Sequence, residues 1–479
     1  MRCAVHCQKR RGSAVAQTLF DRIWDAHVIA DLGGGWVLLH IDRHLLHDLS
    51  GGPALADLAS RGLPVSRPDL CFATPDHAVS SRPGRTGDTF ERGAALYAGL
   101  RDRAQEAGIT FFDLGRPGQG IVHVMAPELG ITLPGLTLVC GDSHTCTNGG
   151  LGALAFGIGS SEVLHVLATQ TLRQKKPRQM RITYDGSLPF GVTAKDVALH
   201  VIGTLGAAAG VGHAIEHAGP GIAFMPIEGR LTLCNLSVEL GAKMAFCAPD
   251  QTTVDYVRGR PLAPTGDLWE AAVRDWTALR TDDDAEFDNE ARFDLAGIPP
   301  MITWGTSPEH ATAVDGFVPD PRSAPDAAGR EAWQSAIDYM GLRPGQVLRG
   351  TPVDWVFIGS CANSRLSDLR DAARVVNGRR VSPGVQAWVV PGSVEVSQAA
   401  EREGLLDLFR SAGFQWREPG CSMCVAANGE TVPPGSRSIS TSNRNFVGRQ
   451  GPGARTHLAS PATAAASALA GVIADVREV

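Results

Sequence analysis

Three cysteines in the C-terminal part of the chain have the spacing of ligands for a metal centre. Cys421 and Cys424 form a C-x-x-C pair, and Cys361 precedes them by about sixty residues, directly after the apolar run VDWVFIGS. Together they predict a three-thiolate site, which can hold a [4Fe-4S] cluster with one iron left open. An open iron suits Lewis-acid chemistry better than electron transfer. From these residues alone, a redox dithiol and a zinc site completed by His457 remain alternatives.

Two arginines in the segment SNRNFVGRQ are candidates for binding a carboxylate substrate. Arg444 and Arg449 lie five residues apart around Gly448, after the β-like run SRSISTS. A guanidinium group pairs with a carboxylate through two parallel hydrogen bonds, so the pair suits a substrate with two carboxylates. Either arginine alone is more typical of a solvated surface charge. Their position beside the cysteine loops favours the binding role.

Three segments that contain histidine could supply a proton to a departing group. ATPDHAVS contains Asp76 and His77, GIVHVM contains His123, and CGDSHT contains Asp142 and His144. A carboxylate beside a histidine fixes its tautomer and raises its basicity. An isolated histidine is more often a satisfied core or surface residue. CGDSHT favours a functional role, because it follows a buried-type strand and precedes a glycine-rich turn.

Alternating strands and helices must bring these residues together. Short β-branched runs alternate with helical patterns along the chain, which is typical of an α/β fold. In the C-terminal region, four predicted strands each lead into a polar loop: VDWVFIG, VQAWVV, FQWRE and SRSISTS. Ligands bind outside the carboxyl ends of strands in an open α/β sheet, so these loops are expected to converge on one crevice.

The length of 479 residues predicts about three domains. We expect a disordered leader over residues 1–16 and α/β domains over residues 17–178, 179–300 and 301–479. In the first domain, ALAFGIGSSEVLHVLATQTL is expected to form one long helix. The basic stretch RQKKPRQ, at residues 173–179, is expected to be an exposed connector.

Composition excludes several classes of function. The net charge of −6 lacks the excess of positive charge that is typical of nucleic-acid-binding proteins. No run approaches 18 apolar residues and the start lacks a signal-peptide core, so we expect a cytoplasmic protein with no membrane segment. Ten irregularly spaced cysteines indicate thiol or metal chemistry in a reducing compartment rather than a disulfide scaffold. Cys3 and Cys7, in the arginine-rich leader, are given no role.

Five motifs, in order, resemble the aconitase family over nearly the whole chain after about Gln17: GDSHTCTNGGLGALAFGIG, CNLSVELGAK, IGSCANSR, PGCSMC and STSNRNFVGRQG. HIDRHLLH, QGIVHVMAPELGITLPG and EGRLTLCN resemble most the large subunits of its bacterial 3-isopropylmalate dehydratase branch. The resemblance implies a three-domain α/β/α arrangement around a [4Fe-4S] cluster, lacking the mobile swivel domain.

The resemblance also implies roles for particular residues. Asp76 and His77 are similar to the pair that protonates the leaving hydroxyl. The cluster ligands and their neighbour are implied to be Cys361, Cys421, Cys424 and Asn443. Further catalytic groups are implied to be His123, Asp142, His144 and Glu239, with substrate contacts from Ser143, Asn235, Arg444 and Arg449.

The implied reaction is dehydration of a hydroxy-dicarboxylate and rehydration at the adjacent carbon, here isomerising 2- and 3-isopropylmalate in leucine biosynthesis. The swivel domain and the catalytic serine are implied to lie on a small subunit of about 200 residues. Ala362 and Asn148 depart from the usual family sequence and put the substrate in doubt. The alternatives are a homoaconitase, a citraconate or methylmalate hydratase, an alkyl- or arylmalate isomerase, and a non-enzymatic RNA-binding regulator.

Overall fold

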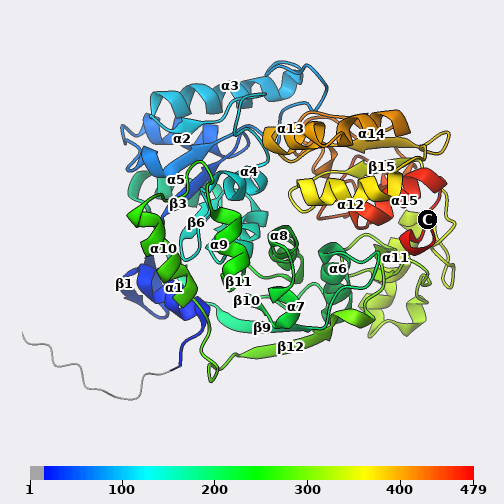
Figure 1. The fold of residues 1–479 in the computed structure, drawn as a ribbon, viewed down its shortest axis with the longest axis horizontal. Helices are drawn as coiled ribbons and strands as arrows, with labels where there is room; N and C mark the ends of the chain where they lie inside the picture. The colour runs from blue at the N-terminus through cyan, green and yellow to red at the C-terminus, as the bar shows by residue number, and fades with distance from the viewer. Residues whose placement is uncertain (1–15) are drawn as a thin grey trace, which may run out of the picture.

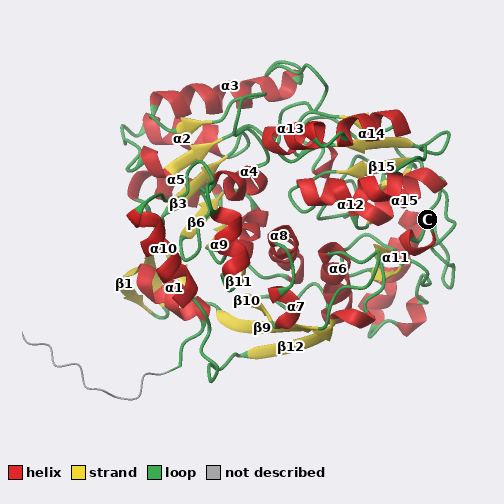
Figure 2. Ribbon diagram, viewed as in Figure 1, coloured by secondary structure: helices red, strands yellow, loops and turns green. Residues whose placement is uncertain are grey.

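The computed structural model describes residues 16–479, so Cys3, Cys7 and nearly all of the expected leader lie outside the described residues. Two α/β regions lie side by side in Figure 1, one around β3 and β6 and the other around β15. Helices cover both regions, as Figure 2 shows. Between residues 16 and 479, no helix has the length and apolar character needed to cross a bilayer.

The first region is built on a sheet that has nine strands among the described residues. Its neighbours pair in parallel except for β11 with β7. In spatial order the strands are β12 (Asn289–Asp294), β9 (Arg178–Asp185), β10 (His213–Ala218), β11 (Met244–Cys247), β7 (Leu154–Gly157), β6 (Thr137–Cys140), β3 (Arg43–Leu46), β4 (Cys71–Ala73) and β5 (Thr110–Phe111). This sheet crosses the expected boundary at residue 178, and the division into two domains there stays a prediction.

The second region is a parallel sheet with five strands in the described chain. Its order is β17 (Gln415–Trp416), β16 (Gln386–Val389), β15 (Trp355–Ile358), β18 (Arg437–Ser440) and β19 (Arg455–Leu458). The four C-terminal strands predicted from sequence are confirmed as β15, β16, β17 and β18. Because they run in parallel, the loops after them leave the sheet at one edge.

The helices of the N-terminal and central parts are α1 (Leu19–His27), α2 (Gly51–Ser60), α3 (Glu91–Glu106), α4 (Val122–Leu129), α5 (Ser160–Thr169), α6 (Ala194–Leu205), α7 (Pro220–Ala223), α8 (Ile227–Leu236), α9 (Gln251–Val257) and α10 (Asp267–Ala278). Those of the C-terminal part are α11 (Ala327–Met340), α12 (Leu366–Val376), α13 (Val394–Arg402), α14 (Leu405–Ala412) and α15 (Pro461–Ala470). The 3-10 helices η2 (Ser143–Leu151), η3 (Ser237–Leu240) and η6 (Ser422–Cys424) lie in site loops.

Two local predictions in the first region are wrong. The run expected as one long helix divides into β7 and α5, because Gly157 and Gly159 interrupt it and its apolar start completes the buried sheet. The expected connector at residues 173–179 lies largely in strands: β8 (Thr171–Lys175) and the start of β9. β8 joins β1 (Val28–Gly33) and β2 (Trp36–His40) in a small antiparallel sheet. An additional pair consists of β13 (Met301–Thr303) and β14 (Ala311–Ala313).

Candidate active site

The carboxyl ends of the five-stranded sheet bring the three cysteines together. Cys361 follows β15, Cys421 and Cys424 follow β17, and all three side chains are buried. Asn443, after β18, places its side-chain oxygen 3.3 Å from the Cys424 sulfur and 3.8 Å from the Cys361 sulfur. The amide nitrogen of Asn235 lies 3.2 Å from the same Cys361 sulfur. The predicted convergence is confirmed for the loops after β15, β17 and β18.

Two serines beside the cysteines adopt the left-handed backbone region. Ser360 has φ of 85° and Ser422 has φ of 48°, a conformation that costs about 1–3 kcal/mol for a residue with a side chain. The Ser360 hydroxyl donates to the carbonyl of Thr441 at 3.1 Å, and the Ser422 hydroxyl donates to Glu430 at 2.6 Å. These hydrogen bonds hold both turns, as expected where a fold keeps strain at a functional site.

The three sulfur atoms do not all lie within 4.8 Å of one another. Three or more ligating atoms within 4.8 Å of one another occur, in residues 16–479, only in a histidine and aspartate cluster that contains no cysteine. Thiolates bound about 2.3 Å from one zinc ion would lie about 3.8 Å apart. A [4Fe-4S] cluster instead spreads its ligands over separate corners, so the cysteine arrangement fits the cluster better.

The zinc alternative with His457 is wrong. One ring nitrogen of His457 lies 2.7 Å from the Arg437 guanidinium, and the other lies 2.6 Å from the carbonyl of Thr303. Both nitrogens are therefore engaged elsewhere, at the far strand of the sheet.

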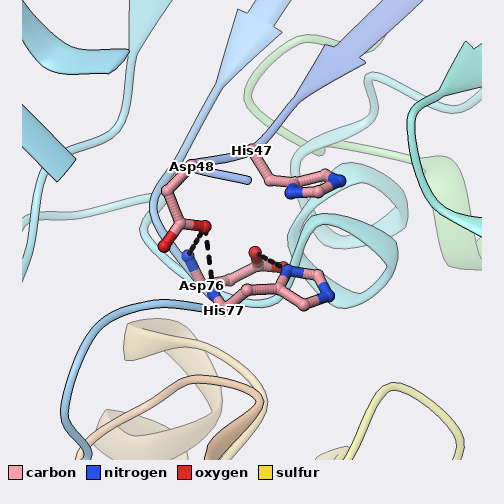
Figure 3. A group of neighbouring side chains, drawn as sticks. All are labelled: His47, Asp48, Asp76 and His77. Atoms are coloured by element: carbon pink, nitrogen blue, oxygen red, sulfur yellow. Dashed lines mark hydrogen bonds and ion pairs between the residues drawn. The ribbon is translucent and has the colours of Figure 1, made fainter. Parts of the chain in front are cut away.

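The carboxyl ends of β3, β4 and β6 supply the acidic and basic groups. These strands are adjacent and parallel, so the loops after them meet. The Asp48 carboxylate accepts hydrogen bonds from the backbone N–H groups of Asp76 and His77 at 3.3 and 3.1 Å (Figure 3). It also accepts from the backbone N–H of Ala78 at 2.5 Å. The ring of His47 lies opposite that of His77, with centroids 4.5 Å apart. Asp48, in the loop after β3, therefore holds the backbone segment that positions His77.

His77 lies between two carboxylates. Its Nδ1 is 2.5 Å from Asp76, and its Nε2 is 3.2 Å from Asp142. The other Asp76 oxygen accepts from the backbone of Val122 at 3.0 Å, at the start of α4. Burial alone would lower the pKa of His77, but Asp76, Cys421 and Asp142 outweigh it and hold that pKa well above its usual value. His77 is therefore protonated at neutral pH and suited to donate a proton.

Asp142 gathers three histidines around one carboxylate. Besides His77, it lies 3.5 Å from ring nitrogens of His123 and His144, and it accepts from the backbone of His144 at 2.7 Å. Burial raises its pKa, but the nearby imidazole rings of His123, His144 and His77 reverse that effect and hold the pKa well below its usual value. Asp142 is thus an anion that lies among all three rings.

Glu239 connects this group to an arginine. Its Oε1 lies 3.0 Å from Nε2 of His144 and 2.7 Å from Nε of Arg444. The carboxylate is largely buried, whereas Arg444 retains 27% exposure of its side chain. Arg444 is held at one end and leaves its remaining N–H donors for a carboxylate ligand.

The comparisons with known proteins agree with this geometry. The family model described as aconitase family (aconitate hydratase) matches residues 21–471. The chain belongs to the aconitase family. It is 65% identical over 461 residues to 3-isopropylmalate dehydratase large subunit 1 of Bradyrhizobium diazoefficiens, covering 96% of each chain. A crystal structure of Thermococcus kodakaraensis aconitase X, holo-form, matches with a TM-score of 0.45 and 11% identity, covering 85% of this chain and 84% of that one.

Two predicted site residues of this aconitase-family chain stand apart from the network. Ser143 is exposed at the start of η2. Arg449 stacks its guanidinium 5.4 Å from the ring centroid of Phe446, and its buried Nε has no hydrogen-bond partner among the described residues. Both roles stay predictions.

The two departures from the usual family sequence are both buried. Asn148 accepts from the Thr132 hydroxyl at 2.6 Å, and its amide nitrogen lies 3.4 Å from the ring of His123. The carbonyl of Ala362 accepts from the Thr232 hydroxyl at 2.9 Å and from Arg365 at 3.0 Å. These contacts place Asn148 behind His123 and hold the Cys361 loop through its backbone.

Sequence reasoning missed two carboxylates that organise the site. Asp48 holds the Asp76–His77 turn, and its position directly after the β3 run could have identified it. Glu430 accepts from the backbone and hydroxyl of Ser81 at 2.8 and 2.6 Å and pairs with Arg417 at 3.0 Å. Because Glu430 lies in an irregular loop, no spacing in the sequence indicates this role.

Proposed function

We propose that this chain is the large subunit of a 3-isopropylmalate dehydratase, a hydro-lyase of class EC 4.2.1.33. The reaction converts 2-isopropylmalate to 3-isopropylmalate by loss and return of water, as a step of leucine biosynthesis. The near full-length identity to the Bradyrhizobium large subunit supports this function. The site supports the same chemistry, because it combines a proton donor, carboxylate-binding groups and three clustered thiols.

The proposal depends most on one hydrogen bond that connects loops of the two sheets. The backbone N–H of Cys421 donates to the carbonyl of Asp76 at 2.8 Å. This bond places the Asp76–His77 pair against the loop of two cysteines, although they are more than 300 residues apart in sequence. A substrate held at the thiol site would therefore lie beside the proton donor.

The proposed cofactor is a [4Fe-4S] cluster held by Cys361, Cys421 and Cys424, with one iron not ligated by protein. When bound, it would supply a Lewis acid for the substrate hydroxyl and carboxylate. The amide nitrogens of Asn235 and Asn443 lie 3.2 and 3.6 Å from the Cys361 sulfur and would donate to this ligand, as outer-shell groups do at other metal sites.

The residues of this chain would handle the proton and the carboxylates. His77 would give its proton to the departing hydroxyl, for which general acid catalysis contributes about 10²- to 10⁴-fold. Asp76 and Asp142 would stabilise the His77 cation before transfer and keep its ring in place. Arg444, with Arg449, would bind the substrate carboxylates through paired hydrogen bonds.

The proposed partner is a small subunit of about 200 residues that carries the swivel domain and the catalytic serine. That serine would remove the carbon-bound proton, and the partner would also shape the pocket for the substrate side chain. The proposal thus assigns the acid to this chain and the base to its partner.

One experiment tests both cofactor and substrate. The chain would be reconstituted anaerobically with iron and sulfide, combined with the proposed small subunit, and assayed with 2-isopropylmalate, homocitrate, citramalate and larger alkylmalates. We expect iron–sulfur absorbance and the highest kcat/KM for isopropylmalate. Stoichiometric zinc without iron–sulfur absorbance would overturn the cofactor, and preference for another acid would overturn the substrate.

A further inference from the structure

Lys195, in the first turn of α6, is a buried cation that the proposed mechanism does not use. Its side chain is fully inaccessible to solvent. Its Nζ donates to the backbone carbonyls of Thr441 at 3.0 Å and Ser442 at 2.6 Å. These two residues directly precede Asn443, whose side-chain oxygen contacts the sulfurs of Cys361 and Cys424. Lys195 therefore supports the segment that touches the thiols.

The Lys195 ammonium has no carboxylate partner in the described chain within 4.0 Å. Its neighbour Asp196 is turned away and accepts from the backbone of Met301 at 2.8 Å. The N-terminus of a helix carries a partial positive charge, which also disfavours a cation at this position. A buried cation is costly unless an opposite charge lies nearby.

Through Asn443, the segment that Lys195 holds contacts the sulfurs of Cys424 and Cys361. Burial lowers the pKa of Lys195 to about 8, and the nearby groups that most oppose this fall are Cys424 and Cys361, ahead of Asp368 and Glu239. Cysteines bind metal as thiolates, so these two sulfurs become anionic when the proposed cluster is held.

We infer that Lys195 is a positioning residue for the cluster: its ammonium offsets the charge of the Cys361 and Cys424 thiolates and holds the backbone that orients Asn443. This inference rests on the cluster of the proposed function. Net charge and hydrogen bonding near the sulfurs set the reduction potential of an iron–sulfur cluster. Loss of the lysine charge therefore makes the cluster harder to reduce.

The test compares Lys195→Met with Thr193→Ala in the reconstituted complex with the small subunit. Thr193 caps the same turn of α6 and accepts from the Lys195 backbone, so its removal loosens the helix start but keeps the charge. We expect K195M to shift the midpoint potential of the cluster to a more negative value. A redox titration monitored by EPR measures this shift. We also expect K195M to release iron to a chelator about 10-fold faster, the size of effect that outer-shell residues have on metal sites. T193A should leave both values at wild type.

A second measurement separates the cluster from the fold. The thermal midpoint of K195M is expected to fall with the cluster bound and to change little in the cluster-free chain, where the lysine lacks its counter-charge. An unshifted potential in K195M, an equal shift in T193A, or a cluster-free K195M that fails to fold would each overturn the inference. Failure of the wild-type chain to bind any iron–sulfur cluster would overturn the proposed function as well.

Discussion

Asp142 is the residue on which most of the proposed chemistry converges. It contacts ring nitrogens of His77, His123 and His144, which come from three separate segments. One carboxylate thus sets the orientation of three rings and helps to keep His77 protonated. An uncharged isostere would keep the shape of the site and lose this stabilisation.

The first prediction concerns Asp142→Asn. We expect kcat to fall about 10²- to 10⁴-fold, because the proton donor loses its stabilising anion and its fixed orientation. Steady-state assay of the complex measures this. Asp42→Asn is the matched control, since Asp42 pairs with His27 at 2.7 Å away from the site and should affect stability only. A D142N enzyme within about threefold of wild type would contradict the assignment.

The second prediction concerns pH and Glu128 in α4. Burial raises the pKa of Glu128 from 4.5 to about 7, against the lowering effect of a 2.6 Å hydrogen bond from Ser393. The folded chain therefore holds a proton that the unfolded chain releases above pH 4.5. The free energy of unfolding from this group falls as pH rises from 4.5 to about 7, by roughly 1–3 kcal/mol.

Glu128→Gln removes this titration. We expect the variant to gain stability over wild type at about pH 8 and to differ little at about pH 4. Chemical denaturation at both pH values measures the difference in the free energy of unfolding between the variant and wild type. The contributions of other buried acids drop out of this difference, because both proteins contain them. The same pH dependence in the two proteins would show that Glu128 is ionised in the folded state.

At the scale of elements, the loops after β4 and β17 are fastened by Glu430. Its carboxylate accepts from Ser81 and Ser422 and pairs with Arg417, and both charged side chains of the pair are only 9% exposed. Ser81 lies a few residues after His77, and Ser422 directly follows Cys421. The proton donor and the cysteine loop are thus held in register by one buried group.

The third prediction is that Glu430→Ala lowers the free energy of unfolding by about 3 kcal/mol, because it leaves the buried Arg417 charge unpaired. Thermal or chemical unfolding checks this. Glu403→Ala, which breaks the exposed pair with Arg370, is the control and should cost less than about 1 kcal/mol. Equal losses in the two variants would mean that the Glu430 pair is effectively solvated.

At the scale of the whole molecule, the site lies between two sheets. The nine-stranded sheet contributes the histidines and aspartates, and the five-stranded sheet contributes the cysteines and arginines. Besides the Cys421 to Asp76 bond, the Arg365 guanidinium donates to the carbonyl of His123 at 3.2 Å, and Gly120 bridges to Ser393. The proposed substrate contacts Ser143 and Arg444 are the more exposed members, so the site is open on that side.

The fourth prediction is that the chain alone gives no measurable turnover and that the small subunit restores it. The open side leaves the substrate in contact with water and without the proposed base. Titration of the small subunit into a fixed amount of cluster-loaded chain should give activity that saturates at equimolar ratio. Robust turnover by the chain alone would remove the need for a base on the partner.

Features that depend on neighbours along the chain could be predicted from the sequence. Strand periodicity and the polar loops after each strand identified β15 to β18, and the C-x-x-C spacing with family motifs identified the cysteines and the acid pair. One prediction from local sequence was wrong. The segment at Leu154 was expected to be helical but forms a strand, because its apolar side chains pack in the core of the central sheet.

Which of these residues meet depends on the three-dimensional packing of the sheets. His77 and His144 share Asp142 because β4 and β6 both pair in parallel with β3, an order that the chain does not display in sequence. His123 joins them from α4, which follows β5. The same long-range packing occupies both nitrogens of His457, sets Arg449 apart and buries Lys195 beneath Asn443. Contacts between distant segments depend on how sheets stack and pack, and this information is spread over the whole chain rather than held in any one motif.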